Sequence, residues 1–307
     1  NTASGNYIQN MSGYGVYFIA GADDNVVSQS TVVTNGPGYA AVYLDGSDRN
    51  IVTGSFVSNP SGYGVDLEPG SDYNTVSLST VIGGDNPGLF ILRSSSNNVF
   101  NSYVQGSTAA LISGSTGTVV GGSVFIATNT AGSAFALVTG VNLTIATSTL
   151  LAPESGRGLY LDTGNRGVLT LADDTFTGSA HGMVISTQGA LFQFALNTLT
   201  FQALAPGATA MPFLGGTVVA PFTRANLADA SVDVNVNAEA LDPLSRINMN
   251  AHSGARTGSD YENDPNGLVS WELPYPGCDV TRNVGASQDY ATISAGVAAL
   301  PTTLTGH

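Results

Sequence analysis

Two adjacent aspartates and a nearby histidine are the residues of this chain whose types best suit acid–base chemistry. His181 follows the pair Asp173 and Asp174 by seven residues, counted from Asp174. Carboxylates and an imidazole can act together only when they face one cleft. The second kind of chemistry that this sequence suggests is metal binding. Whether acid–base chemistry or metal binding is possible depends on the secondary-structure elements that carry the candidate residues.

The candidate metal ligands lie in a long polar turn, residues 256–267. Asp260, Glu262 and Asp264 present carboxylates at alternate positions, as the first part of a calcium loop does. No bidentate glutamate follows at the required offset, so an ordinary turn with solvated carboxylates is the favoured alternative. The same two interpretations apply to the earlier acidic turns at Asp23–Asp24, Asp45 with Asp48, Asp72 and Asp85.

A repeat of about 24 residues organises the first third of the chain. Asn25, Asn50, Asn74 and Asn98 are separated by 25, 24 and 24 residues. The first three are preceded by related segments: GYGVY at 13–17, GYAAVY at 38–43 and GYGVD at 62–66. A period of this length occurs in leucine-rich repeats, parallel β-helices and some helical repeats.

The composition of each period decides between these architectures. Short runs alternate apolar and polar residues and are rich in Val, Ile, Thr, Tyr and Phe, without a stripe of period 3.6. No fixed leucine frame appears. The sequence therefore predicts an all-β fold, a right-handed parallel β-helix of about nine coils over residues 1–223.

This coil separates the acid–base candidates. Seven residues are about a third of a coil, so His181 is expected round the corner from Asp174 and not above it. The pair of aspartates followed by His181–Gly182 resembles the polygalacturonase-type β-helix hydrolases. That family's Asn-Thr-Asp and Arg-Ile-Lys elements are absent, and the pectate-lyase arrangement is missing too. We therefore expect no catalytic residues and no enzyme; a polysaccharide hydrolase or lyase, similar to a tailspike, is the alternative.

The repeated turns hold two further kinds of side chain. Asparagine suits a turn because it tolerates the left-handed region, and stacked asparagines can bond one another along the coil axis. Tyr14, Tyr39 and Tyr63 are also expected to stack. An exposed tyrosine row could bind sugar rings, which gives a glycan-binding module as another alternative.

Charge and composition narrow the partners. The chain has a formal charge of −14, eight arginines and no lysine, which disfavours nucleic acid, anionic membranes and polyuronates. A single cysteine, Cys278, excludes an internal disulfide framework. No run of 18 apolar residues occurs, so no membrane insertion is expected. A neutral surface of Ser, Thr, Asn and Gly is typical of secreted and cell-surface prokaryotic proteins.

The repeat is lost in the last third. Residues 224–278 are predicted to be a β-rich extension and linker, in which the alternation at 230–237 suggests an antiparallel or edge strand. Residues 279–307 resemble the opening of pectin-lyase-like right-handed β-helices, where a short strand leads into a capping helix. The resemblance implies that Ile293, Val297 and Leu300 face inward. The chain thus starts inside one solenoid and ends at the start of another.

These ends resemble those of tandem modules in giant bacterial surface and filament proteins, cut out of phase. The sequence therefore favours a structural extracellular module that joins head to tail or in tandem into a surface fibre, sheath or adhesin stalk. Its expected partner is a neighbouring copy, with cell-surface glycans as a further candidate partner. No cofactor is expected apart from a possible Ca²⁺ ion.

Chelation tests the turn interpretation of the acidic residues. We expect a chelator to change the melting temperature little, because solvated turn carboxylates hold no structural ion. A tightly bound ion contributes several kcal/mol through linkage. A fall of more than several degrees, measured by circular dichroism, would assign calcium to these turns.

Overall fold

The computed structural model describes the chain continuously through its first half and in separate strands beyond. The described residues are 1–153, 156–162, 164–186, 191–197 and 199–204, followed by the strands from β27 to β34. Compact units divide after Glu272, and the second unit, Leu273–His307, lies outside the described residues together with the predicted capping helix. No helix occurs among the residues that are described.

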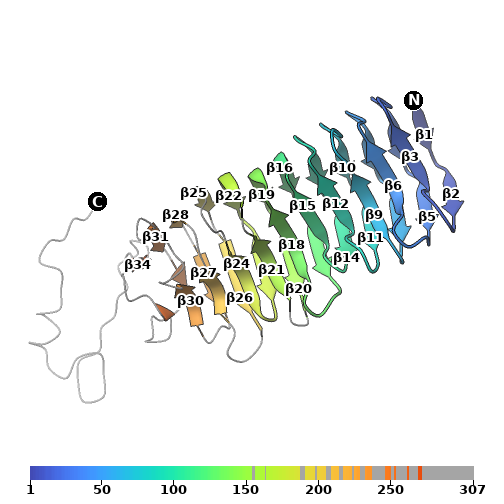
Figure 1. Ribbon diagram of the computed structural model, residues 1–307. Helices are drawn as coiled ribbons and strands as arrows, with labels where there is room; N and C mark the ends of the chain where they lie inside the picture. Colours follow the sequence, from blue (N-terminus) through green and yellow to red (C-terminus); the bar gives the residue numbers. More distant parts are fainter. Residues whose placement is uncertain are drawn as a thin grey trace, which may run out of the picture. The chain divides into compact units, whose positions relative to one another are not determined.

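Three parallel sheets make up the first unit, Asn1–Glu272, and each receives one strand from each coil, except that β34 of the last coil adds to the first sheet only (Figure 1). The first sheet has 12 strands: β1 (Thr2–Ser4), β4 (Val26–Ser28), β7 (Ile51–Thr53), β10 (Thr75–Ser77), β13 (Asn98–Phe100), β16 (Thr116–Gly121), β19 (Val141–Ala146), β22 (Arg166–Ala172), β25 (Leu191–Asn197), β28 (Thr217–Phe222), β31 (Arg246–Met249) and β34 (Val269–Trp271).

The second sheet has 11 strands: β2 (Tyr7–Asn10), β5 (Thr31–Thr34), β8 (Phe56–Asn59), β11 (Thr80–Gly83), β14 (Tyr103–Gly106), β17 (Val124–Ala127), β20 (Thr149–Ala152), β23 (Thr175–Gly178), β26 (Leu199–Ala203), β29 (Ala225–Ala228) and β32 (His252–Ser253).

The third sheet also has 11 strands: β3 (Val16–Ile19), β6 (Ala40–Asp45), β9 (Tyr63–Leu67), β12 (Leu89–Leu92), β15 (Ala110–Ser113), β18 (Ser133–Val138), β21 (Arg157–Leu161), β24 (His181–Ile185), β27 (Thr209–Phe213), β30 (Val232–Val236) and β33 (Tyr261–Glu262).

The core is a set of columns in which each buried side chain lies directly above its counterpart one coil away. In the second sheet the register joins Ile8, Val32, Val57, Val81, Val104, Phe125, Leu150, Phe176 and Phe201. From Val32 onward every member is fully buried. The period of two along each strand sends these residues inward and their neighbours outward, so the predicted all-β parallel coil is confirmed.

A buried serine occupies the turn between the first and second sheets in successive coils. A residue with φ between 47° and 60° precedes each one, which bends the chain sharply. The backbone N–H of each serine donates to the hydroxyl of the next at 3.1–3.3 Å, through Ser30, Ser55, Ser79, Ser102, Ser123 and Ser148. This serine ladder satisfies turn N–H groups that the strands leave unpaired.

An asparagine ladder fills the turn between the third and first sheets, and its fourth member differs from the one predicted. The N–H groups of Asn25, Asn50 and Asn74 donate to the Oδ1 atoms of Asn50, Asn74 and Asn97, at 2.9, 2.7 and 2.8 Å. Asn98, the predicted member, begins β13 and is half-buried, whereas Asn97 is 1% exposed.

Two other expectations differ from the structure. The first sheet has ten strands before residue 223, β1 to β28, so the coil count differs slightly from the predicted nine. Within the alternating segment at 230–237, Val232–Val236 form β30, which pairs in parallel with β27 and β33 and is neither antiparallel nor an edge. Apolar and polar residues can alternate in both parallel and antiparallel strands, so the alternation alone does not determine the direction of strand pairing.

Replacing one asparagine at a time tests the ladder. We expect Asn97→Ala to lower the free energy of unfolding by about 1–3 kcal/mol, because the buried N–H of Asn74 loses its acceptor. Asn98→Ala is the matched control and should cost only a few tenths of a kcal/mol. Thermal melts of both variants decide the point, and equal losses would show that Asn97 has no special role.

Candidate functional site

The predicted acid–base residues occupy two different corners of their coil. Asp174 is 1% exposed and continues the serine ladder: its Oδ1 accepts the N–H of Ser148 at 2.8 Å, and its Oδ2 accepts that of Ala172 at 3.0 Å. Burial raises the pKa of the Asp174 carboxyl to about 7. Asp173 has a φ of 56° and forms the bend before it. The carboxylate therefore has a structural task in the turn.

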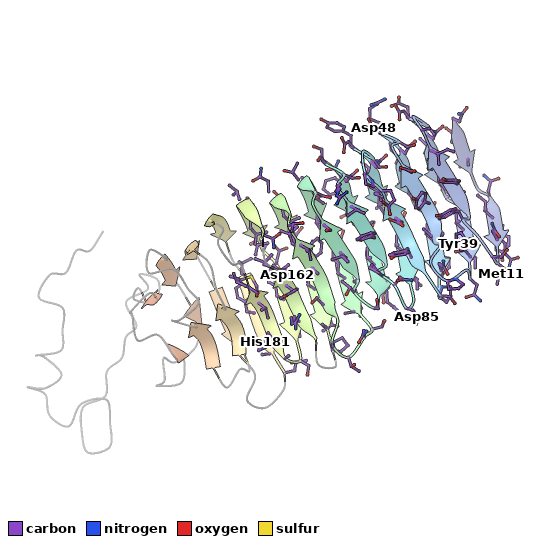
Figure 2. The ribbon with its side chains drawn as sticks, in the orientation of Figure 1. Met11, Tyr39, Asp48, Asp85, Asp162 and His181 are labelled. Atoms are coloured by element: carbon purple, nitrogen blue, oxygen red, sulfur yellow. The ribbon has the colours of Figure 1, made fainter. Side chains whose placement is uncertain are left out.

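His181 lies one corner further along the chain. It begins β24 in the third sheet, where it is paired in register with Arg157 of β21 (Figure 2). The whole strand β23 of the second sheet separates it from Asp174. The structure thus keeps apart the residues that a hydrolase site of this kind would need together, as the spacing predicts.

Few of the predicted metal ligands can be placed. Asp260 and Asp264 lie outside the described residues, and Glu262 ends β33, in register with Asn235. Within the described part of the chain, no group of three or more His, Cys, Asp or Glu side chains is arranged to hold a metal ion.

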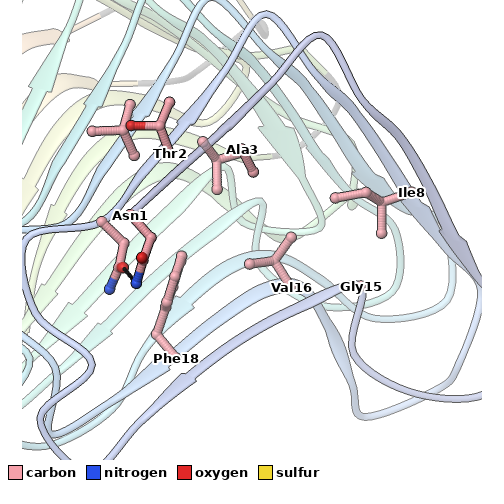
Figure 3. Close-up of a pocket in the computed structure, with 10 residues that line it drawn as sticks. Asn1, Thr2, Ala3, Ile8, Gly15, Val16 and Phe18 are labelled. Atoms are coloured by element: carbon pink, nitrogen blue, oxygen red, sulfur yellow. Dashed lines mark hydrogen bonds between the residues drawn. The ribbon is translucent and has the colours of Figure 1, made fainter.

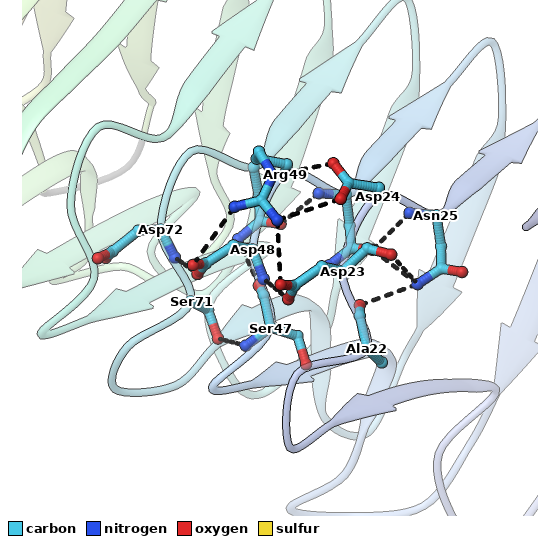
Figure 4. A network of polar contacts seen from close by, with 11 residues as sticks. Ala22, Asp23, Asp24, Asn25, Ser47, Asp48, Arg49, Ser71 and Asp72 are labelled. Carbon is cyan, nitrogen blue, oxygen red and sulfur yellow. Dashed lines mark hydrogen bonds and ion pairs between the residues drawn. The ribbon is translucent and has the colours of Figure 1, made fainter.

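Four residues of the earlier acidic turns, Asp23, Asp24, Asp48 and Asp72, form a polar network that includes Arg49 (Figure 4). The N–H of Asp48 donates to Oδ1 of Asp23, and that of Asp72 donates to Oδ1 of Asp48, both at 2.8 Å. The Arg49 guanidinium lies 3.1 Å from Asp23 and 2.9 Å from Asp24. These carboxylates are thus engaged by backbone N–H groups and one arginine, an arrangement that favours the turn interpretation.

The first coil exposes part of the core. A pocket of about 250 Å³ is lined by the inward-facing side chains of β1, β2 and β3, among them Ala3, Ile8, Val16 and Phe18 (Figure 3). These residues are only half-buried, whereas their counterparts in the second coil, such as Val32 and Leu44, are almost completely buried. The first coil therefore presents an apolar end face.

A tyrosine cluster covers the outside of the third sheet over the first three coils. It comprises Tyr14, Tyr17, Tyr39, Tyr43 and Tyr63. The Tyr14 ring lies 4.9 Å from Tyr17, 5.0 Å from Tyr39 and 4.4 Å from Tyr43, measured between centroids. Tyr14 and Tyr39 were predicted to stack, but their rings meet edge to face, at an interplanar angle of 86°. Tyr63 stacks on Phe90 at 5.6 Å.

Asp66 is the residue of this surface that sequence reasoning missed. It belongs to β9, lies in register between Tyr43 and Phe90, and is only 5% exposed. Burial, and next the charge of Glu68, raise the pKa of the Asp66 carboxyl to about 8. Its Oδ1 atom is buried without a hydrogen-bond partner. The available signal was the acid in the third copy of the GYGVY motif, where the first copy has Tyr17.

Comparison with known proteins agrees with this architecture. A family model described as the right handed beta helix region matches residues 1–150. The fold is a right-handed parallel β-helix. No curated protein sequence matches the chain. No helix within the described residues has the length and hydropathy needed to span a membrane.

The matching family model identifies a fold and no particular reaction or ligand, so the function must be argued from the surfaces of this molecule. Two of them are unusual among the described residues. One is the apolar end face of the first coil, and the other is the buried Asp66 carboxyl group beside the tyrosine cluster, whose Oδ1 atom has no hydrogen-bond partner.

Substituting Asp66 tests its protonation. A carboxyl whose pKa is raised from 3.8 to about 8 stays protonated in the folded state while it ionises in the unfolded chain. The resulting stability is lost as pH rises from about 4 to about 8, at roughly 1.4 kcal/mol per pKa unit. Asp66→Asn should therefore raise the melting temperature, and by more at pH 9 than at pH 5.

Asp45→Asn is the control, because Asp45 ends β6 on the same outer face but is exposed. Melting curves of both variants and the parent chain across this pH range give the comparison. A stabilisation by Asp66→Asn that is constant or shrinks with rising pH would contradict a buried neutral carboxyl.

Proposed function

We propose that this chain is a structural extracellular module that joins head to tail or in tandem into a fibre, sheath or adhesin stalk. The apolar end face of the first coil is the observation that carries this proposal. The tyrosine cluster bears on a separate question, taken up below.

The end face combines two features that favour association. Its inward side chains line the pocket of about 250 Å³, and β1, β2 and β3 each pair with a neighbour on one side only. Unpaired strand edges next to exposed apolar groups are templates for further strand pairing. The outer rim is apolar as well, since Tyr7, Met11 and Ile19 are 67%, 53% and 45% exposed.

The sides of the solenoid offer no comparable edge within the described coils. There the backbone is paired from coil to coil in all three sheets, and the serine and asparagine ladders satisfy the turns. Growth along the axis is therefore favoured over lateral growth. Contact between two different ends is heterologous and propagates as an open filament unless the rotation closes a ring.

The proposed occupant of the end face is the segment 279–307 of a neighbouring unit, whether or not the two units share one polypeptide. Its predicted inward residues, Ile293, Val297 and Leu300, would add apolar side chains to those of the first coil. An extracellular, prokaryotic setting is supported by a Ser-, Thr-, Asn- and Gly-rich composition that lacks lysine.

Sedimentation velocity over a range of concentrations tests the association. We expect the full chain to self-associate, and Phe18→Asp to weaken this at least about tenfold, because burying an unpaired carboxylate costs well over 1.4 kcal/mol. The matched control is Tyr73→Asp, which places the same charge at a 60% exposed residue of a later turn and should change little.

Removing residues 279–307 separates this proposal from a general stickiness of the end. The truncated chain should remain monomeric while keeping the melting temperature of the parent β-helix. A full chain that is monomeric at every concentration reached, or one that associates equally well without 279–307, would refute the proposed contact.

A further inference from the structure

Asp66 lies in an outward-facing column that is otherwise aromatic or aliphatic. The register of the third sheet joins Tyr17, Tyr43, Asp66, Phe90, Leu111, Ala136, Tyr160 and Val184. Val65 and Leu67, on either side of Asp66, are buried in the core, so the period of two directs Asp66 outward. Its short side chain is therefore flanked by two larger rings, Tyr43 one coil before and Phe90 one coil after.

The groups around Asp66 carry negative charge or can acquire it. The negative charge of Glu68 raises the pKa of Asp66, and that of Asp66 in turn raises the pKa values of Tyr14, Tyr43 and Tyr63. The pKa of the Glu68 carboxyl is raised by burial first and by Asp45 second, while Arg93 lowers it less. The positive charge of Arg93 lowers the pKa of Glu68, and Asp66 forms no ion pair with it. The charge of Asp66 thus has no close counter-ion in the described part of the chain.

A polar group elsewhere in the same column shows the contrast. Tyr160 donates from its hydroxyl to Oδ1 of Asp162 at 3.0 Å, and the Arg157 guanidinium carbon lies 4.4 Å from the Tyr160 ring centroid. Tyrosine, carboxylate and cation are all present there. Around Asp66 the tyrosine and the carboxyl group are present, but no cation forms an ion pair with Asp66 among the described residues.

The unpartnered oxygen adds an independent observation. Five buried side-chain atoms among the described residues have no hydrogen-bond partner, and Oδ1 of Asp66 is the single carboxylate atom among them. An unpaired buried acceptor costs about 1–3 kcal/mol, and more when it is charged. A ligand that donates a hydrogen bond to this atom recovers that cost. Because Oδ1 is closed off from solvent, one of the flanking rings must shift to admit the donor.

We propose that Asp66, Glu68, Tyr43, Tyr63 and Phe90, here named the Asp66 cluster, bind an organic cation with N–H donors, namely a primary ammonium on an alkyl chain. The N–H groups would bond Oδ1 of Asp66, the positive charge would offset the two carboxylates, and the alkyl stem would pack along the rings. Cations are attracted to ring faces as well as to carboxylates. The chain has no lysine, so this ammonium comes from another molecule.

The ligand approaches from the solvent side of the third sheet. Glu68, Tyr43, Tyr63 and Phe90 are half-buried there, and Tyr17 and Tyr39 of the neighbouring coils are 51% and 39% exposed. A sugar ring could also stack on these tyrosines and donate from a hydroxyl. The anionic surroundings favour the ammonium over the neutral sugar, and the sugar becomes an outcome of the test.

Binding should be linked to the titration of Asp66. An ammonium stabilises the ionised carboxylate, so its affinity should rise as pH increases from 6 towards the pKa of about 8 and level off above it. An alkylammonium has a pKa near that of lysine, about 10.4, and stays charged throughout this range. Glu68, Asp45, Arg93 and the three tyrosines also face the cluster, so the pH profile must be compared between variants.

The experiment is an NMR titration of the full chain with n-butylammonium chloride, at ionic strength matched with sodium chloride. We expect saturable shifts of the Asp66 carboxyl and the Tyr43 and Tyr63 rings in the millimolar range, as suits a ligand of five heavy atoms. n-Butanol is the uncharged counterpart of the probe and should bind at least about tenfold more weakly, and glucose represents the sugar.

Matched variants locate the site. Asp66→Asn and Tyr43→Leu should each weaken n-butylammonium binding by about tenfold or more, and Asp66→Asn should abolish the rise in affinity with pH. Tyr160→Leu, in the same column but outside the cluster, should leave binding within about twofold. Asp66→Asn retains the size of the side chain and is expected to stabilise the fold, so loss of binding would not reflect unfolding.

Several results would overturn the proposal. Equal affinity for n-butanol and n-butylammonium would show an apolar contact without cation recognition. Shifts with glucose and none with n-butylammonium would assign a sugar site. Binding that survives Asp66→Asn, or no saturable shift with any probe, would remove the Asp66 cluster as a cation site.

Discussion

In-register parallel pairing between coils is the interaction on which the rest of the structure depends. Each side chain lies above its counterpart one coil away, at a spacing of about 4.8 Å. A side chain at any position is therefore packed against the side chains at the equivalent position of the coils before and after it. For Val57 and Val81 this makes a continuous core, and for Ser55 and Ser79 it makes a hydrogen-bonded ladder. For charged groups the same geometry is a difficulty.

The chain meets that difficulty in two ways. In the acidic turns, the carboxylates of Asp23 and Asp48 accept backbone N–H groups of the next coil, and Arg49 contributes the opposite charge. Asp174 is buried more deeply, yet it accepts two backbone N–H groups and so replaces a serine in its ladder. Asp66 has neither solution, because its neighbours in the column are Tyr43 and Phe90. The comparison explains why the carboxyl group that lacks a hydrogen-bond partner is that of Asp66 and not one of the more conspicuous Asp173–Asp174 pair.

Much of the fold could be predicted because, in a repeat protein, equivalent residues recur in the sequence at the length of one coil. The separation of Asp174 and His181 followed from the same spacing. What failed is local: coil length is not constant, so a count of 24 residues reached Asn98, while the ladder steps by 23 residues from Asn74 to Asn97. The direction of strand pairing at β30 could not be predicted, because it depends on neighbours one coil away. The acid that ends the third motif copy marked Asp66 as unusual, but its burial depends on Tyr43 and Phe90 in the adjacent coils.

The hydrogen-bonded ladders and the end face of the first coil both follow from the need of each coil for a neighbouring coil. A coil can satisfy its backbone and bury its core only against another coil, and within the stack Leu44 and Val32 are buried in that way. At the first coil, Ile8, Val16 and Phe18 have a partner on one side and the pocket on the other. The first coil therefore lacks, on its outer side, the coil-to-coil contact that buries Val32 and Leu44. The proposed head-to-tail association would supply that contact, with strand pairing and apolar burial of the kind that already joins one coil to the next.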